Sequence, residues 1–85
     1  MEVGPFLRSK RKGLGLTISE SAMRLNTTRH RIDNWERGLA TPQSKYVKKM
    51  MRLYGFTMDQ YLEALRGTLL RKAEKQITML KRRCS

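Results

Sequence analysis

One short stretch of the sequence carries the side chains best suited to recognise another molecule. Its polar residues recur at spacings of three and four, which place them on one side of a helix: Arg29, His30, Asp33 and Asn34. Arginine pairs with the O6 and N7 atoms of guanine, asparagine pairs with the N6 and N7 atoms of adenine, and aspartate accepts from the N4 amino group of cytosine. We therefore predict that this side of the helix can read base edges in the major groove of double-stranded DNA.

A plainer interpretation of the same residues is a solvated helix surface. Asp33 can orient Arg29, four residues before it, as readily as it can meet a base. His30 is the only histidine of the chain, and a lone histidine is more often a surface hydrogen-bonding residue than a metal ligand or a base. The stretch holds no carboxylate pair, nucleophile or metal-ligand cluster, so the sequence predicts no enzyme, no cofactor and no metal site.

Two short helices joined by a tight turn are predicted to hold these side chains. Thr17 is a suitable N-cap for the first helix, and Glu20 three residues later completes a capping box. Asn26 tolerates the left-handed conformation that a sharp helix exit requires. Thr28 can cap the second helix, and Gly38 ends it. The pattern therefore indicates two helices in close succession, with the polar residues on the second.

The opposite side of the second helix is mainly apolar. Ile32, Trp35 and Glu36 share it, and Trp35 is the only tryptophan of the chain. We expect this side to pack against the rest of the domain, because a helix buries its apolar stripe. The polar side would then remain exposed on a rigidly held helix.

The composition limits the class of partner. The chain has 85 residues, enough for one small domain, and its 19 Lys and Arg against 7 Asp and Glu give a formal net charge of +12. Such an excess favours a polyanionic partner, although charge alone does not separate DNA from RNA, a ribosome or an anionic membrane. Here the basic residues are spread over every segment and the helical periodicity is regular, unlike the Gly- and Pro-rich tails of many ribosomal proteins.

The compartment follows from what the sequence contains. Its single cysteine, Cys84, excludes an intramolecular disulfide and a cysteine-based zinc site. No apolar run approaches the length of a membrane span, and the first residues lack the apolar core of a signal peptide. We therefore expect a cytoplasmic protein without a membrane partner.

These residues and their neighbours resemble the helix-turn-helix domain of phage repressors and Cro-like regulators, the XRE family. The similarity begins at LRSKRKGLGLT (7–17), continues through IDNWERG (32–38) and the loop LATP (39–42), and ends at YGFTMDQYL (54–62). It implies an all-α, five-helix lambda-repressor-like domain with an extended fifth helix. It also implies a sequence-specific DNA-binding transcriptional regulator, in the form of a dimeric autorepressor such as phage and plasmid operons encode, in a bacterial or phage-infected cell.

We divide the chain into three parts: a lead-in (1–5), the DNA-binding domain (6–66) and a basic amphipathic helix (67–85). Within the domain, four helices are expected near 6–14, 18–25, 29–37 and 45–54. A capping box at Thr57 and Gln60 opens a fifth. The core is expected to contain apolar residues from all five helices: Phe6, Leu7, Leu14, Ala22, Leu25, Ile32, Trp35, Val47, Met50, Met51, Tyr54, Met58, Tyr61, Leu62 and Leu65.

The resemblance also assigns residues outside the base-reading surface. In similar proteins an arginine at the position of Arg11 pairs with a glutamate at the position of Glu36, so we expect an ion pair that fixes the first helix against the third. Phosphate contacts are expected from six residues at helix starts and in the loop: Thr17, Thr28, Arg37, Thr41, Ser44 and Lys45. The chain departs from the family at Ile18, where a phosphate-binding glutamine is usual, and at Ser21, where leucine is usual.

The segment beyond residue 66 extends past the usual family template. An apolar stripe continues along it at spacings of four and three: Leu65, Leu69, Ala73, Ile77 and Leu80. A single exposed stripe favours a second copy of the chain, so we predict a homodimer on a two-half-site operator. The alternatives are a stripe that folds back on its own domain and contact of the basic tail with membrane or DNA. Gly67 also allows a break or bend of the helix.

Two other functions are open to the sequence. The tail can bind a toxin, which would make the protein the antitoxin of a toxin–antitoxin pair. The protein can also be a general nucleic-acid binder, which predicts equal affinity for random and selected duplexes with a steep dependence on salt.

Overall fold

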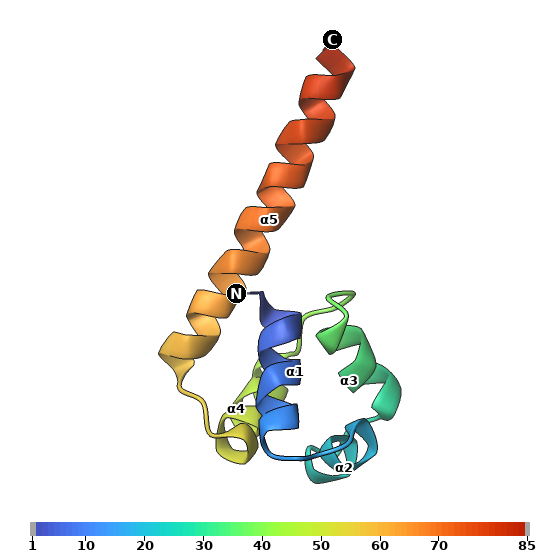
Figure 1. Cartoon of the computed structure of the whole chain (residues 1–85), viewed down its shortest axis with the longest axis vertical. Helices are drawn as coiled ribbons and strands as arrows, with labels where there is room; N and C mark the ends of the chain where they lie inside the picture. Colours follow the sequence, from blue (N-terminus) through green and yellow to red (C-terminus); the bar gives the residue numbers. More distant parts are fainter. Residues whose placement is uncertain (1, 85) are drawn as a thin grey trace.

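The computed structural model describes the backbone of residues 2–84 and the side chains of residues 2–71. Over these residues the chain forms helices and no strands (Figure 1). The five helices are α1 (Val3–Gly13), α2 (Ile18–Arg24), α3 (Arg29–Glu36), α4 (Ser44–Tyr54) and α5 (Met58–Cys84). The predicted all-α architecture with a long fifth helix is confirmed, and α5 continues through Gly67 as one helix, without the break that the sequence allowed.

Short-range hydrogen bonds define the turn between α2 and α3. The Thr17 hydroxyl accepts from the backbone N–H of Glu20 at 3.1 Å, and the Glu20 carboxylate accepts from the N–H of Thr17 at 3.4 Å, which completes the predicted capping box. The Thr28 hydroxyl accepts from the N–H of Arg31 at 3.2 Å. Asn26 adopts the left-handed conformation, with a φ of 54°. All of these predictions are confirmed, and each involves residues close together in the chain.

The link between α4 and α5 is equally local. Gly55 ends α4 in the left-handed conformation, with a φ of 75°. Thr57 and Gln60 then form the second predicted capping box, with hydrogen bonds of 2.9 and 3.2 Å. These residues set where α5 starts, but they leave its direction to tertiary contacts.

Helix α1 begins earlier than expected, within the segment predicted to be a lead-in (1–5). Val3 is 4% exposed and continues the apolar pattern of Phe6 and Leu7 back by one turn. Pro5 lies in the first helical turn, where its missing N–H removes no intrahelical hydrogen bond. Residues 3–5 therefore belong to the folded domain, and that part of the prediction is wrong.

The end of α1 also differs from the prediction. Leu14 was placed in the core by the apolar pattern but is 52% exposed. Because α1 ends at Gly13, the next residues leave the helical periodicity on which the prediction rests. Leu16, which is 9% exposed, enters the core instead.

Helix α5 confirms two of its four predicted core residues, Tyr61 and Leu65, and contradicts the other two. Met58 and Leu62, both expected inside, are 42% and 50% exposed. Tyr61 and Ala64 are buried, at 6% and 2% exposure, and Leu65 packs partly against the core. Residues three apart share one side of a helix, so Tyr61 and Ala64 define the buried side. The neighbouring apolar side of α5 therefore stays exposed.

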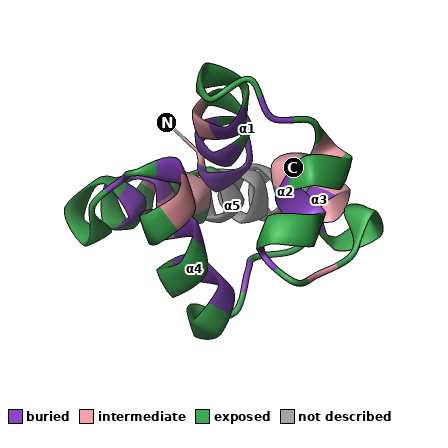
Figure 2. Cartoon of the chain, turned by 90° about the horizontal axis from the view of Figure 1, so that it is seen from below, coloured by how far each residue is buried: buried purple, intermediate pink, exposed green. Residues whose placement is uncertain are grey.

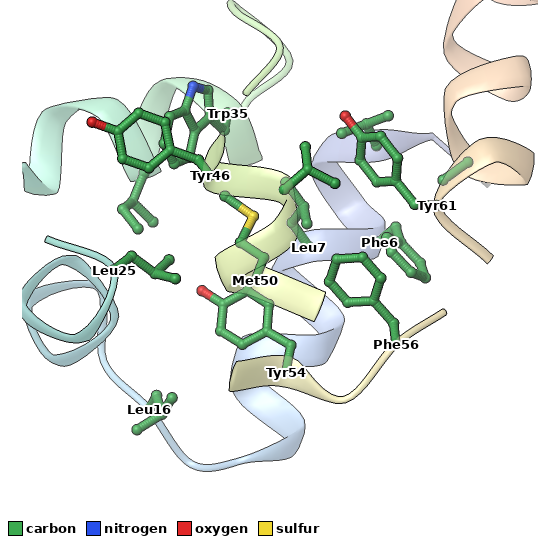
Figure 3. Close-up of a cluster of buried hydrophobic side chains, with 14 of the residues drawn as sticks. Phe6, Leu7, Leu16, Leu25, Trp35, Tyr46, Met50, Tyr54, Phe56 and Tyr61 are labelled. Carbon is green, nitrogen blue, oxygen red and sulfur yellow. The ribbon is translucent and has the colours of Figure 1, made fainter. Parts of the chain in front are cut away.

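Two groups of aromatic side chains lie at opposite ends of the core (Figure 3). Near α5 the Phe6 ring lies edge-on to Phe56, with centroids 5.1 Å apart, and Phe56 stacks on Tyr61 at 6.1 Å. Beneath α3 the rings of Trp35 and Tyr46 are 5.2 Å apart. The apolar pattern singles out neither Phe56, which follows the end of α4, nor Tyr46, which lies beside the predicted stripe of that helix.

Helix α4 buries the side that the sequence predicts. Val47, Met50 and Tyr54 are 5%, 1% and 7% exposed, and Met51 is partly buried. In the view from below, the buried parts of the helices face the middle of the domain and the exposed parts lie on the outside (Figure 2). A small but continuous core therefore supports every helix around it.

The helices are arranged around α1, which packs against α3 and α5, while α2 packs against α3. Helix α5 projects from the domain, and this projection gives the chain extents of 49 × 26 × 22 Å (Figure 1). The architecture therefore has two parts: a compact domain that supports α3, and a helix that leads away from it.

Candidate nucleic-acid interface

The buried side of α3 is anchored in the core. Ile32 and Trp35 are 2% and 5% exposed, and the Trp35 ring packs on Tyr46 of α4. A large aromatic side chain in such a position removes much apolar area from water and fixes the rotation of its helix. The opposite side of α3 is therefore presented to solvent in one orientation.

An ion pair fixes the same helix against α1, as the sequence predicts. Arg11 donates from Nε to one carboxylate oxygen of Glu36 at 2.7 Å and from Nη2 to the other at 2.9 Å. The two side chains are only 8% and 7% exposed. A third guanidinium nitrogen, Nη1, donates to the carbonyl oxygen of Leu16 at 2.8 Å. The hydrogen bonds to Glu36 raise the pKa of Arg11 even though burial opposes the charge.

The exposed side of α3 carries the predicted base-reading residues. Arg29 and His30 are exposed, and Asp33 and Asn34 are half-buried. The amide nitrogen of Asn34 lies 3.3 Å from Nε2 of His30, one helical turn earlier. Arg29 makes no hydrogen bond or ion pair with the part of the chain that the structure describes. Its guanidinium group is therefore available to a ligand.

Asp33 has a different partner from the one considered in the sequence. Its carboxylate accepts from Nη1 of Arg37 at 3.4 Å, one turn later, and not from Arg29. The pair is on the surface, with the Arg37 side chain 66% exposed, so it is weak and can exchange for other partners. Asp33 therefore leaves Arg29 without a competing carboxylate.

A hollow of about 190 Å³ beside α3 brings together residues from three elements. Asn34 and Thr41, both predicted to contact DNA, line it together with Arg31, Gln43 and Tyr46. Nη1 of Arg31 donates to the Tyr46 hydroxyl at 3.1 Å, and its guanidinium carbon lies 5.9 Å from the centre of the Tyr46 ring. Arg31 is thus oriented by α4, although it extends from α3.

Sequence reasoning missed Arg31 and Gln43. Arg31 lies three residues before Asn34, so helical spacing alone could have placed the two on neighbouring positions of the same surface. Gln43 precedes a predicted helix start, which is a weak signal by itself. The contact with Tyr46 joins residues 15 apart in sequence, and no local pattern predicts it.

The two threonines predicted to bind phosphate have structural roles. Thr17 and Thr28 are exposed, and the oxygen of each hydroxyl accepts the capping hydrogen bond of its helix. A hydroxyl has one proton to donate in addition to the lone pairs it uses as an acceptor. Each threonine can therefore cap its helix and still donate to an anion.

The start of α4 offers free backbone donors. Gln43 is its N-cap residue and makes no side-chain hydrogen bond to the first turn. Ser44 and Lys45, the predicted phosphate ligands, are exposed there. The Lys45 and Lys49 ammonium groups lie 5.1 and 5.8 Å from the Tyr46 ring centre. Unpaired N–H groups at a helix start together with neighbouring cations favour an anion.

The two remaining predicted phosphate ligands lie at the far end of α3. Arg37 and Thr41 both line a second hollow of about 190 Å³, which the start of α1 and the middle of α5 complete. Thr41 lines the first hollow as well, so it connects the two. Arg37 lies near the C-terminal end of α3, at a distance along the helix from Arg29.

The part of the chain that the structure describes holds neither a metal-binding cluster nor a helix that could span a membrane. No cluster of three or more His, Cys, Asp or Glu side chains there is arranged to hold a metal ion. None of the helices in that part of the chain combines the length and apolar character needed to cross a membrane.

Comparison with known proteins agrees with this geometry. A family model described as helix-turn-helix matches residues 7–61. The chain belongs to the helix-turn-helix family. This match confirms the resemblance to Cro- and phage-repressor-like regulators, and it covers both capping boxes as well as α3. The helix-turn-helix domain supports a DNA-binding transcriptional regulator.

A solved structure shares the helix-turn-helix fold of this chain. The clp gene regulator ClgR from Corynebacterium glutamicum superimposes with a TM-score of 0.68 over 92% of this chain and 84% of that chain, at 23% sequence identity. No curated protein matches the sequence. At this identity the likeness to ClgR describes the fold alone.

Proposed function

We propose that the protein is a sequence-specific transcriptional repressor that binds double-stranded DNA as a dimer and reads the major groove with α3. One observation carries this proposal. Helix α3 is anchored by Trp35 and by the pair of Arg11 with Glu36, while its opposite side exposes Arg29, His30 and Asn34. An α-helix fits the major groove, and these side chains match base-edge chemistry.

Discrimination between bases would come from the exposed side of α3. Arg29 has no described partner to release before it pairs with guanine O6 and N7. Asn34 exchanges its contact with His30 for the N6 and N7 atoms of adenine. Asp33, whose pair with Arg37 is exposed, can turn to the amino group of cytosine.

The DNA backbone would be held on either side of that groove. On one side lie the free N–H groups at the start of α4 with Ser44, Lys45 and Thr41, and Arg31 is added to this set. Thr17 at the start of α2 and Thr28 at the start of α3 donate their hydroxyl protons on the other. Phosphate contacts fix position on the duplex, and the net charge of +12 strengthens them at low salt.

The exposed apolar side of α5 supports a second copy of the chain as partner. Leu62 and Leu69 are 50% and 58% exposed, and Leu65 lies between them, partly buried. Beside this row lies a mainly apolar hollow of about 500 Å³, lined by Val47 and Pro42 among others. Of the stripe predicted from the sequence, Ala73, Ile77 and Leu80 lie outside the described side chains. A twofold dimer would place its two α3 helices about 34 Å apart, which matches successive major grooves.

Repression would follow from occupancy. Control would come through protein concentration and dimerisation, because both raise the fraction of operator that is occupied. A dimer bound across a promoter excludes polymerase, and a binding site in its own promoter makes the regulator an autorepressor. A reporter gene placed behind the selected operator tests this step, because repression lowers its expression and activation raises it.

The decisive experiment selects bound sites from a random duplex library. We expect one two-half-site sequence to emerge, and Arg29→Ala to relax preference at one position at a cost of about 1–3 kcal/mol. The matched control is Arg8→Ala, which removes the same charge from an exposed position of α1. If Arg29→Ala and Arg8→Ala weaken binding to all sequences equally, or if no sequence is enriched, the protein is a general nucleic-acid binder.

Dimerisation has its own test. Light scattering of the free protein should give twice the mass of one chain, and Leu69→Glu should give the mass of one chain. Met23→Glu introduces the same charge at a methionine that is 79% exposed on α2, and it should leave the dimer intact. A wild-type protein that remains a monomer on its selected operator would contradict the dimer.

A further inference from the structure

Two hydrogen bonds join the first residues of the chain to the middle of α5. The N–H of Val3 donates to the hydroxyl oxygen of Thr68 at 2.9 Å. Nη1 of Arg71 donates to a carboxylate oxygen of Glu2 at 2.7 Å. The partners are 65 and 69 residues apart in sequence, and they close one side of the second hollow described above.

Thr68 provides the side-chain cap that is missing at the start of α1. Glu2 is the N-cap residue of α1, and its side chain makes no hydrogen bond to the first turn. The first N–H groups of a helix have no intrahelical partner, so the Thr68 hydroxyl caps α1 from outside. Its own proton is directed to the carbonyl oxygen of Ala64 at 3.3 Å, which orients the lone pair toward Val3.

Both contacts lie just beyond Gly67, one and four residues after it. Glycine weakens a helix interior relative to alanine, because it loses the most conformational freedom on becoming helical, so the helix deforms more easily there. The helix rises about 1.5 Å per residue, so the portion after Arg71 reaches about 20 Å farther. A small change of direction at Gly67 would therefore move the end of α5 by several ångströms.

The same N-terminal residues also touch the end of α3. Gly4 packs so closely on the last turn of α3 that a Cβ atom there would overlap the carbonyl oxygen of Glu36. Residues 2–4 therefore contact α3 through Gly4 and α5 through Glu2 and Val3. They form a short bridge between the helix that faces DNA and the helix that projects from the domain.

We propose that residues 2–4 act as a latch that fixes the direction of α5 beyond Gly67 relative to α3, and thereby sets the half-site spacing that the dimer accepts. The latch itself requires only this chain, and its effect on spacing rests on the proposed dimer. An exposed ion pair adds little to folding stability. A choice between two directions of one helix at a glycine requires little free energy, so a weak pair supported by a cap suffices.

Distances between spin labels test the latch directly. One label goes on Cys84, the only cysteine, and the other on Ser9→Cys at an exposed position of α1. Labelled protein is diluted into an excess of unlabelled protein so that only distances within one chain are measured. We expect one narrow distribution of label-to-label distances in the wild-type protein. Glu2→Arg and Arg71→Glu should each broaden this distribution.

The critical comparison is between the two single charge reversals and the variant that combines them. The double variant Glu2→Arg with Arg71→Glu restores opposite charges and should restore the narrow peak. Thr68→Val removes the cap at nearly constant volume and should broaden the distribution, while Glu63→Arg, an exposed charge reversal on α5 outside the latch, should not. Narrow peaks in both single reversals, or a double variant that stays broad, would overturn the proposal.

The spacing is tested on the selected operator with its half-sites moved apart or together by single base pairs. Each single reversal should bind neighbouring spacings nearly as well as the best one, and the double variant should recover the wild-type preference. A broadened distance with unchanged spacing preference would refute the link between latch and spacing. A wild-type protein indifferent to spacing would refute the dimer on DNA, whereas the label distances would still decide the latch.

Discussion

Two ion pairs in this molecule have the same length and different surroundings. Arg11 meets Glu36 at 2.7 Å, and Arg71 meets Glu2 at 2.7 Å. In the first pair the side chains are 8% and 7% exposed, and in the second they are 61% and 30% exposed. Distance alone therefore gives no measure of what either pair contributes, because solvent screens the exposed pair and not the buried one.

The two ion pairs also differ in the parts of the molecule that they join. The buried pair has two parallel hydrogen bonds and a third donor on Leu16, so it belongs to the structure that holds α3 against α1. The exposed pair has one hydrogen bond and lies beyond the core on α5. The first pair is part of the fold that supports the candidate DNA-binding surface, and the second joins the chain start to a projecting helix whose direction we propose it fixes.

The largest expected effect is from breaking the buried pair. Glu36→Ala leaves the Arg11 guanidinium buried without its carboxylate, which should lower the free energy of unfolding by about 3 kcal/mol. Urea denaturation followed by tryptophan fluorescence measures it. The double variant Arg11→Met with Glu36→Leu should lose less than Glu36→Ala, because it buries no charge. Equal losses would mean that the pair stabilises by attraction and not merely by avoiding an orphan charge.

A smaller effect is expected at Gly4, where the two regions meet. Gly4→Ala forces the start of α1 away from the carbonyl of Glu36 and should cost about 1–3 kcal/mol. The control is Gly13→Ala in the last turn of the same helix, where an added Cβ meets nothing within 4 Å. That change should be neutral or slightly stabilising, by up to about 1 kcal/mol. Equal changes in the free energy of unfolding for Gly4→Ala and Gly13→Ala would contradict the close contact of Gly4 with Glu36.

Arg11→Lys separates charge from geometry in the buried pair. Lysine keeps the positive charge but cannot make the two parallel hydrogen bonds and the contact with Leu16 together. Loss of one net hydrogen bond should cost about 1 kcal/mol, clearly less than Glu36→Ala. A loss as large as that of Glu36→Ala would show that geometry and not charge is decisive.

The smallest effect is expected from the exposed pair. Arg71→Gln should leave the free energy of unfolding unchanged within error, because a pair this exposed is screened by solvent. Repeating the urea titrations of the wild type, Glu36→Ala and Arg71→Gln at high salt sharpens the contrast, since salt should weaken the exposed pair more than the buried one. A measurable loss of stability for Arg71→Gln would contradict the claim that only the buried pair contributes to folding stability.

The geometry of the candidate DNA-binding surface was partly predictable. Helical spacing placed Arg29, His30 and Asn34 on one side of α3, and the buried Trp35 fixed which side is exposed. Arg31 was missed because its contact with the Tyr46 hydroxyl depends on where α4 lies.

The core was predicted well along the regular apolar stripe of α4 and poorly at helix ends and along α5. Val47, Met50 and Tyr54 follow a regular stripe and are buried. Leu14 and Met58 lie at helix boundaries, where a shift of a few residues changes which side faces inward, and both are exposed.

The sequence by itself determined the features that depend on neighbours along the chain. The threonine caps of α2 and α3, the left-handed Asn26 and the glycine end of α4 join residues within a turn or two of each other. Their geometry follows from spacing alone, since the donor and the acceptor are already close before the chain folds.

Only the tertiary structure decided that Met58 and Leu62 stay exposed on α5, how Arg31 is oriented and how the first residues hold the middle of α5. The pair of Glu2 with Arg71 joins residues 69 apart, and such a contact exists only once the helices have taken their places. Those places depend on the summed packing of the whole core, which no local pattern specifies.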